Sequence, residues 1–266
     1  MSKQTEKYLE TWDDIEWSAS RVTTAENCLY AFKKIYFDKE NTDNYFAYRG
    51  SMMHNIMEDY YNYIHQYKIP LQSLRAHLVG VFEQLMEECP HEAVMYYRDK
   101  KGKTAKKSMN HNALSWSLMN WKPLSHIKHV EREIKFKVSK YKFRAFLDFE
   151  REYEKLSPSG GIEVITLHGD YKSTYSNKYR LQQYIYMYGK EQVDGKPPRG
   201  FEIIEYKNNF KSVVFEYDRG IIKFVKSDIV EAIQRAKKAV EEDDFPKNPK
   251  DSFFCMNLCK LCEYGR

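Results

Sequence analysis

The sequence predicts an α/β protein in which a helical N-terminal lobe is followed by a region where strands alternate with helices. Three observations support this class. Apolar residues recur at helical spacing through much of residues 18–125. Residues 126–245 contain short runs that alternate apolar and charged residues, together with amphipathic helical stretches. Three cysteines crowd the last dozen residues, which marks residues 246–266 as a cysteine-rich tail.

The composition is that of a soluble globular chain with ample material for a core. Of 266 residues, 42% are hydrophobic and 30% are charged, and the formal net charge of +5 is compatible with a polyanionic partner. No apolar run approaches the roughly 18 residues of a membrane-spanning helix, and the N-terminus lacks the apolar segment of a secretory signal. An odd cysteine count of five favours a reducing cytoplasm and metal ligation over a disulfide framework.

The N-terminal lobe follows a polar segment, residues 1–17, which we expect to be a loosely held arm. A helix start around Thr23 places Cys28 on or beside a helix, where a lone cysteine is usually a small core residue. After a loop at 41–48, residues 51–64 form the next expected helix. His54 and Glu58 are four apart on it, so together they could ligate a metal or simply share a surface hydrogen bond.

The rest of the lobe contains two more expected helices, at 71–88 and 111–121. Cys89 and Pro90 end the first of them, and Cys89 has no cysteine neighbour, so we interpret it as structural. Between the helices, residues 98–107 hold six cations and one acid. This segment is expected to be a solvated loop that could contact a phosphate backbone.

The strands begin with a hairpin formed by residues 128–137 and 141–150. Strand periodicity would place Phe146, Asp148 and Glu150 on one face. An acid at position 148 among apolar neighbours is costly to bury unless it is paired or bound to a metal. Asp148 is therefore a candidate site residue.

The third strand begins at Ile162 and runs into Asp170, Tyr171 and Lys172. Because residues two apart on a strand point to the same side, Asp170 and Lys172 should lie side by side. The carboxylate can hold a divalent cation while the lysine positions or deprotonates an attacking water, which suits phosphodiester hydrolysis. The simpler interpretation is an ion pair of small energetic value.

The remaining elements alternate again. Residues 177–189 predict a helix ended by Gly189, with Gln182 and Tyr186 on one face. Strands at 201–206 and 212–217 form a second hairpin, and a long helix spans 218–242.

The tail carries Cys255, Cys259 and Cys262, whose spacing is typical of ligands to zinc or an iron–sulfur cluster. They could instead be small core residues. A tetrahedral site needs a fourth ligand, and Cys28 is the natural candidate.

Six features together resemble the PD-(D/E)XK nuclease superfamily in its RecB-like branch, and in particular the CRISPR-associated and phage-encoded exonucleases that carry an iron–sulfur cluster. In chain order they are Cys28, the pair Gly50 and His54, Asp148, the pair Asp170 and Lys172, the pair Gln182 and Tyr186, and the C-terminal cysteines. The resemblance spans residues 28–262. Two departures are that residues 144–147 lack the usual glycine, and that the additional cysteine, Cys255, lies upstream of the other two.

The resemblance implies a restriction-endonuclease-like core, in which a mixed sheet is flanked by helices, with cysteines joining the N-terminal lobe to the C-terminus and closing a DNA channel. It implies a metal-dependent deoxyribonuclease, specifically an exonuclease, acting in recombination, repair or phage DNA metabolism. The expected partner is DNA that is single-stranded or has free ends.

The resemblance also implies roles for individual residues. It assigns Mg²⁺ or Mn²⁺ binding to four groups, namely the side chains of His54, Asp148 and Asp170 and the main-chain carbonyl of Tyr171. Lys172 would orient the water, and Gln182 and Tyr186 would brace that lysine or contact DNA. The four cysteines would hold a [4Fe–4S] cluster, with zinc as the alternative.

Two other classes remain open. One is a non-catalytic nucleic-acid-binding module whose cysteines hold zinc and whose acids are structural. The other is a partner protein that kept the nuclease fold and lost activity. Because His54, Asp148, Asp170 and Lys172 are all present, we favour an active nuclease.

Overall fold

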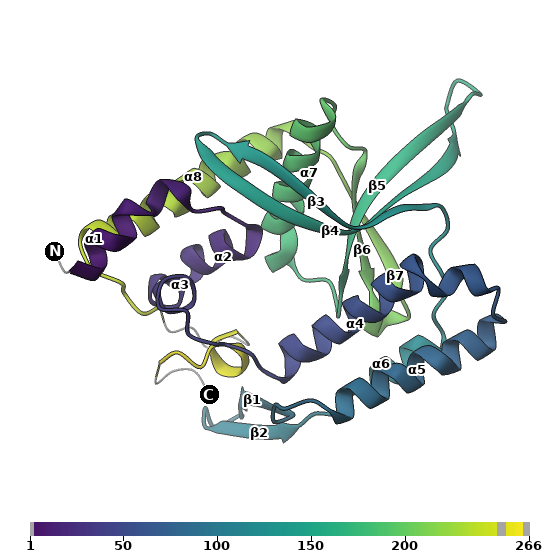
Figure 1. Cartoon of the computed structure of the whole chain (residues 1–266), viewed down its shortest axis with the longest axis horizontal. Coiled ribbons are helices and arrows are strands. Elements are labelled where there is room, and N and C mark those ends of the chain that lie inside the picture. Colours follow the sequence, from purple (N-terminus) through teal and green to yellow (C-terminus); the bar gives the residue numbers. More distant parts are fainter. Residues whose placement is uncertain (1–2, 249–253, 263–266) are drawn as a thin grey trace.

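A computed structural model describes residues 3–248 and 254–262 and confirms the α/β class (Figure 1). The helices that precede the main sheet are α1 (Lys3–Glu10), α2 (Ala19–Asn27), α3 (Leu29–Tyr36), α4 (Tyr45–Asn62), α5 (Leu71–Glu87) and α6 (Asn112–Met119). A small separate sheet consists of β1 (Val94–Arg98) and β2 (Thr104–Ser108). The main region contains β3 (Ile127–Val138), β4 (Tyr141–Leu156), β5 (Ile162–Lys172), α7 (Arg180–Asp194), β6 (Gly200–Glu205), β7 (Lys211–Glu216) and α8 (Arg219–Glu241), and a π-helical turn spans Phe254–Leu258.

The main sheet is mixed, with strand order β3-β4-β5-β6-β7 and one parallel pair, β5 with β6. Helix α7 makes the crossover that a parallel pair requires. Strands β4 and β5 are paired up to Phe149 and Gly169 and then separate, because β4 stays with β3 while β5 continues beside β6. This fork in the sheet is where the candidate site lies.

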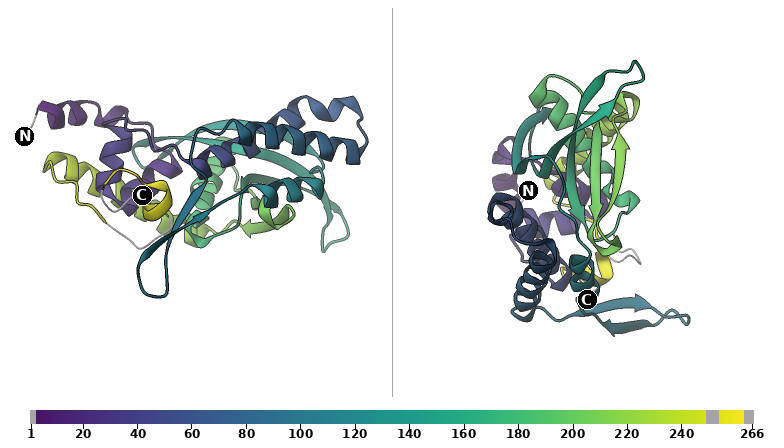
Figure 2. Two further views of the ribbon diagram at one scale, coloured as in Figure 1. Left: turned by 90° about the horizontal axis from the view of Figure 1, so that it is seen from below. Right: turned by 90° about the vertical axis from the view of Figure 1, so that its right-hand side faces the viewer.

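Helices cover both faces of the sheet (Figure 2). On β6, Ile203 packs in a core cluster with residues of α2, α7 and α8, whereas Ile204 packs in a second cluster with residues of α4, α5 and α6. The alternation along a strand thus supplies two separate cores. Among the described residues, no helix has the length and apolarity needed to cross a membrane.

The first 17 residues differ from the expected loose arm. They contain α1, and Trp12 and Trp17 are 2% and 0% exposed. The backbone of Trp17 donates to the carbonyl of Lys142 and accepts from the amide of Arg144, both at 2.8 Å. This segment therefore pairs with the edge of β4 that the fork leaves open, and two tryptophans within a polar stretch provide the packing.

Two helix boundaries also differ from expectation. Helix α4 begins at Tyr45 because the side chain of Asn44 caps it, accepting from the amides of residues 46 and 47. Helix α7 continues past Gly189 and ends before Gly195, whose φ of +69° suits a helix C-terminus. Gly189 instead lets the helix approach Phe136, since a Cβ would lie 2.5 Å from that ring.

Candidate active site

The fork brings together the side chains that the sequence singled out from four separate elements. They are His54 of α4, Asp148 of β4, Asp170 and Lys172 of β5, and Gln182 and Tyr186 of α7. The expected neighbours on β5 do lie side by side, with Lys172 Nζ 2.5 Å from Asp170 Oδ2. The strand period explains this contact, whereas the approach of the other elements depends on tertiary packing.

Asp148 occupies a break in the alternation of β4. Leu147 packs in the cluster with α7 and α8, while Phe149, two residues on, packs in the cluster with α4 to α6. The expectation that Phe146, Asp148 and Glu150 share a face is therefore wrong: Phe146 is 44% exposed, whereas Glu150 is buried. The changed orientation directs Asp148 into the fork.

His54 approaches Asp148 from the opposite helix layer. Its Nδ1 lies 3.0 Å from Asp148 Oδ2, which also accepts a hydrogen bond from the Tyr171 amide at 2.7 Å. Burial alone would lower the pKa of His54, but the Asp148 carboxylate outweighs it and raises that pKa to about 9. Burial would raise the pKa of Asp148, yet His54 and Lys172 lower it to about 2. Among the described residues, His54 therefore pairs with Asp148 and does not form the alternative surface hydrogen bond with Glu58.

Asp170 is a deeply buried carboxyl group of the site, with 2% of its surface exposed. Its Oδ2 contacts Lys172 and accepts a hydrogen bond from Gln182, but its buried Oδ1 has no partner among the described residues. Burial and the nearby Asp148 raise the pKa of Asp170 to about 7. An unsatisfied buried carboxylate oxygen beside a second carboxylate fits a site for a cation.

Gln182 and Tyr186 act together on Asp170. Gln182 Nε2 donates to Asp170 Oδ2 at 3.0 Å and contacts the Tyr186 hydroxyl at 2.9 Å. The hydrogen bonds of Gln182 and Tyr186 therefore act on Lys172 indirectly, through Asp170, its ion-pair partner. Both α7 side chains also line a neighbouring pocket.

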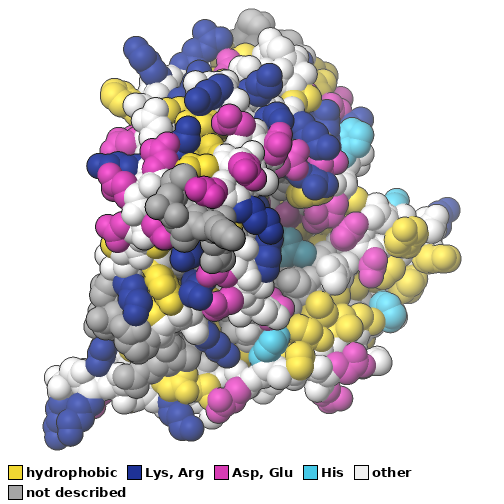
Figure 3. Space-filling model, turned by 60° about the vertical axis from the view of Figure 1, so that its left-hand side comes forward, with side chains coloured by type: hydrophobic (Ala, Val, Ile, Leu, Met, Phe, Trp, Pro, Cys, Tyr) yellow, Lys and Arg dark blue, Asp and Glu magenta, His cyan; other side chains and the backbone are white. Residues whose placement is uncertain are grey.

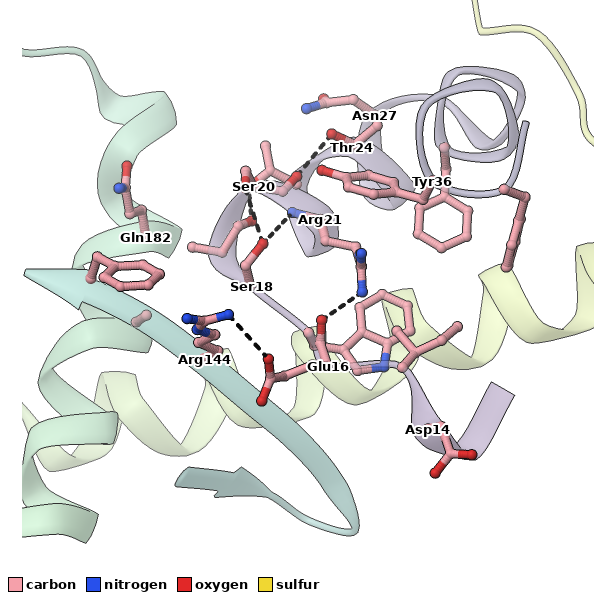
Figure 4. A pocket seen from close by; sticks show the side chains of 18 of the residues that line it. Asp14, Glu16, Ser18, Ser20, Arg21, Thr24, Asn27, Tyr36, Arg144 and Gln182 are labelled. Carbon is pink, nitrogen blue, oxygen red and sulfur yellow. Dashed lines mark hydrogen bonds and ion pairs between the residues drawn. The ribbon is translucent and has the colours of Figure 1, made fainter. Parts of the chain in front are cut away.

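That pocket has a volume of about 1240 Å³ and lies between the N-terminal segment and the sheet (Figure 4). One wall is rich in hydroxyl groups, including Ser18, Ser20 and Thr24, and Figure 4 shows Arg144 and Gln182 on the other side. The exposed ring of Phe146 also lines it, with the Arg144 guanidinium 4.8 Å from the ring centre. Arg144 is ion-paired with Glu133 and Glu16, so the pocket offers mainly polar and aromatic groups next to Gln182 and Tyr186.

Glu131 belongs to the same cluster, although nothing in the sequence singles it out. It lies on β3 between residues paired with Leu147 and Phe149, hence opposite Asp148, and has a φ of +47°. One ligand atom each of His54, Glu131 and Asp148 lie within 4.8 Å of one another. Burial and Asp148 raise the pKa of Glu131 to about 7. In the sequence Glu131 is one of several charged residues of an alternating strand, and nothing there predicts its left-handed backbone conformation.

The cysteines fall into two groups. Cys28 joins α2 to α3 in an extended conformation, and Cys259 packs close to it around Ala31. Burial raises the pKa of the Cys259 thiol, and its neighbours Cys262, Cys255 and Cys28 raise it further. The three other thiols thus act electrostatically on Cys259, and thiolates are the ligands that zinc and iron–sulfur clusters take.

Cys89 lies elsewhere, just after α5, where its Sγ is 3.9 Å from the carbonyl of His91. It packs beside the core cluster formed with α4, α5 and α6. This position agrees with the structural role expected for Cys89.

Fold and site together define a nuclease-type protein: a mixed sheet flanked by helices, forked between an aspartate and an Asp-x-Lys strand end. A family model of the PD-(D/E)XK nuclease superfamily matches residues 16–266. The chain therefore belongs to the PD-(D/E)XK nuclease superfamily, whose members generally use divalent metals. A comparison with curated proteins found no match.

Proposed function

We propose that this protein is a metal-dependent deoxyribonuclease of the RecB-like branch, acting as an exonuclease. The observation that carries the proposal is the unsatisfied, buried Oδ1 of Asp170, next to Asp148 and the ammonium of Lys172. A purely structural ion pair between Asp170 and Lys172 would not require Asp148, a second buried carboxylate that raises the pKa of Asp170. A site that binds a cation and a phosphate requires both carboxylates.

The metal ligands in this proposal are His54, Asp148, Asp170 and the carbonyl of Tyr171, with Glu131 as a further carboxylate. An oxygen-rich set with one imidazole suits Mg²⁺ or Mn²⁺ better than zinc. When bound, such an ion supplies charge stabilisation at the phosphate and lowers the pKa of a bound water. The contact of His54 Nδ1 with Asp148 supports the ligand set, since both atoms lie within reach of one ion.

Lys172 supplies positive charge in this proposal. Burial would lower the pKa of Lys172, but Asp170 and Asp148 raise it above the ordinary lysine value. The ammonium therefore stays protonated at neutral pH and donates hydrogen bonds that orient the water and offset charge at the phosphate. Gln182 and Tyr186 hold Asp170, and thereby Lys172, in this geometry.

The substrate proposed is DNA with a single-stranded segment or a free end. The pocket beside the carboxylates supports a flexible strand, because Phe146 can stack on a base while hydroxyl groups contact its edges. Arg49 of α4 also supports a polyanion: it is 4% exposed and forms no ion pair with the described residues. Its guanidinium lies 5.3 Å from the centre of the Tyr45 ring, and a phosphate would supply the missing counter-charge.

The remaining parts of the proposal concern the cysteines and the setting. Cys28, Cys255, Cys259 and Cys262 would hold a [4Fe–4S] cluster, with zinc as the alternative, and the electrostatic effect of the other three thiols on Cys259 supports either. A cytoplasmic location and a role in recombination, repair or phage DNA metabolism complete the proposal.

The test is hydrolysis of end-labelled single- and double-stranded DNA, blocked or unblocked at each end, with Mg²⁺ or Mn²⁺. We expect degradation from unblocked ends, and losses of about 10²-fold or more for Asp170→Ala and Lys172→Ala, because each removes transition-state stabilisation of several kcal/mol. Lys128→Ala is the matched control, since this half-exposed lysine forms an ion pair with Glu152 away from the fork. Near-normal cleavage by either folded site variant would contradict the assignment. Wild-type protein that binds DNA without cleaving it would favour the non-catalytic classes.

A further inference from the structure

The segment expected to be a solvated loop is largely an ordered hairpin, formed by β1, β2 and the turn between them. It pairs in full register from Val94 with Ser108 to Arg98 with Thr104, and it belongs to no other sheet. Figure 2 shows it projecting from the body of the molecule. A projecting two-stranded ribbon has little stability of its own in water, so something must hold its base.

The exposed part of this hairpin is strongly cationic. Five lysines are solvent-exposed, and they are Lys100, Lys101, Lys103, Lys106 and Lys107. None of the five forms an ion pair with a described residue. Figure 3 shows Lys and Arg side chains gathered on the projection at the lower left.

The single acid of the hairpin is used within its turn. One carboxylate oxygen of Asp99 accepts hydrogen bonds from the amides of Lys101 and Lys103, each at 2.8 Å. Gly102, with a φ of +73°, completes the turn. Asp99 thus stabilises the turn, whereas the lysine charges indicate an anionic partner outside the chain.

The base of the hairpin is held by the segment that carries the C-terminal cysteines. The side-chain amide of Asn257 donates to the carbonyl of Tyr96 at 3.0 Å, and its oxygen accepts from the amide of the same residue. Asn257 is 4% exposed and lies between Cys255 and Cys259. One buried side chain therefore satisfies both backbone groups of a β1 residue, as a neighbouring strand would.

We propose that the hairpin of residues 94–108 is a phosphate-binding arm for the nucleic-acid substrate, and that Asn257 fixes its position. The inference rests on the proposed nuclease function. Rows of lysine on a rigid ribbon neutralise backbone phosphates without reading sequence, which suits an enzyme that works along a strand. The arm contributes to binding while the chemistry stays at the fork.

The first experiment compares two variants of the full-length protein with equal charge. In the arm variant the five lysines of the hairpin become glutamine. In the control variant five exposed lysines elsewhere in the chain become glutamine instead, namely Lys140, Lys196, Lys211, Lys223 and Lys238. Each change lowers the formal net charge from +5 to zero, so general electrostatic attraction falls equally.

Binding of a fluorescein-labelled 30-nucleotide strand and a 30-base-pair duplex is measured without divalent metal at several salt concentrations. For the arm variant we expect the slope of log K against log salt to fall by about 2, and affinity at 0.1 M salt to fall about tenfold or more. The control variant should keep a slope close to the wild-type value. Hydrolysis of the small diester bis(p-nitrophenyl) phosphate with Mn²⁺ should be unchanged in both. Equal slopes in the two variants overturn the arm, and a wild type that binds neither probe overturns both the arm and the proposed function.

The second experiment tests the clamp by limited trypsin digestion, which reports on the lysine-rich hairpin directly. Asn257→Ala should be cut within residues 98–107 several-fold faster than wild type, because the ribbon loses both bonds at its base. Asn257→Asp, which keeps the acceptor and loses the donor, should lie between them. Asn110→Ala, an exposed asparagine just after β2, is the control. Cleavage at the wild-type rate in both Asn257 variants overturns the clamp.

Discussion

His54, Asp148 and Asp170 differ in how their protonation affects the stability of the metal-free protein. The pKa of His54 rises from 6.5 to about 9 on folding, so its contribution is complete below pH 6.5 and is lost as the pH rises through 9. The pKa of Asp170 rises from 3.8 to about 7, so its contribution is lost as the pH rises through 7. The pKa of Asp148 falls to about 2, and its contribution disappears only in acid.

We therefore expect the metal-free protein to become less stable between about pH 4 and 9, first through Asp170 and then through His54, and Mn²⁺ binding to strengthen over the same range because it displaces protons. The measurement is thermal unfolding with and without Mn²⁺, where each kcal/mol corresponds to about 2–4 °C in Tm. His54→Gln should flatten the metal-free profile, whereas His77→Gln, at an exposed position on α5, should leave it unchanged. A His54→Gln profile that matches wild type would show that the His54–Asp148 pair does not titrate as described.

For individual residues, the sequence predicted part of the site. The contact of Asp170 with Lys172 follows from the strand period alone, and the remaining candidates were selected by their order along the chain. Glu131 could not be selected in this way, because its position depends on a left-handed backbone and on the turn of β4 at Asp148. Those features arise from packing on both faces of the sheet.

At the scale of the element, β5 positions Asp170 through the residue before it. A Cβ at Gly169 would lie 2.1 Å from the Phe149 ring and 2.6 Å from the backbone oxygen of Glu202. We expect Gly169→Ala to destabilise the fold by about 1–3 kcal/mol, because the ring and strand must shift, and to displace Asp170 with a loss of activity. Urea unfolding and the nuclease assay measure the two effects.

Gly80 provides the matched control for this substitution. It lies exposed within α5, and a Cβ there would meet nothing within 4 Å. Gly80→Ala should stabilise the protein by about 0.5–1 kcal/mol, since alanine restricts the unfolded chain and favours helix. If the two alanine variants unfold at the same urea concentration, close packing at Gly169 is not what positions β5.

The elements themselves were predicted with uneven success, for physical reasons. β7, much of β3 and the first part of β4 follow the period-two pattern, whereas β6 and the second half of β5 are buried on both faces; the order of the strands along the chain matches expectation. The wrong predictions concern residue types that are compatible with more than one local structure. Gly189 was interpreted as a helix end but provides room for Phe136, and the arginine–lysine run at 98–107 was interpreted as a loop although it forms a hairpin.

At the scale of the whole molecule, the segment after α8 returns to the joint between α2 and α3. The side-chain amide of Asn248 donates to the carbonyl of Asn27 at 2.8 Å, and the amide of Tyr30 donates to the carbonyl of Pro246 at 3.4 Å. These contacts flank Cys28 and bring the segment after α8 back to the joint between α2 and α3. The N-terminal segment also pairs with β4 and lines the pocket beside it.

A metal centre at the four thiols would join the C-terminal segment to the joint between α2 and α3, and its removal should loosen this contact. We expect anaerobically purified protein to contain iron and to absorb visible light. Cys28→Ser should lose that metal and unfold at a lower temperature, because bound metal contributes folding free energy. Cys89→Ser is the control, since Cys89 packs after α5 away from the other four, and it should keep both metal and colour. One zinc per chain in a colourless protein would replace the cluster by zinc at the same thiols. Equal metal content in Cys28→Ser and Cys89→Ser would instead exclude Cys28 as a ligand, and the two segments would then be joined by the hydrogen bonds of Asn248 and Tyr30 and by the packing of Cys259 around Ala31.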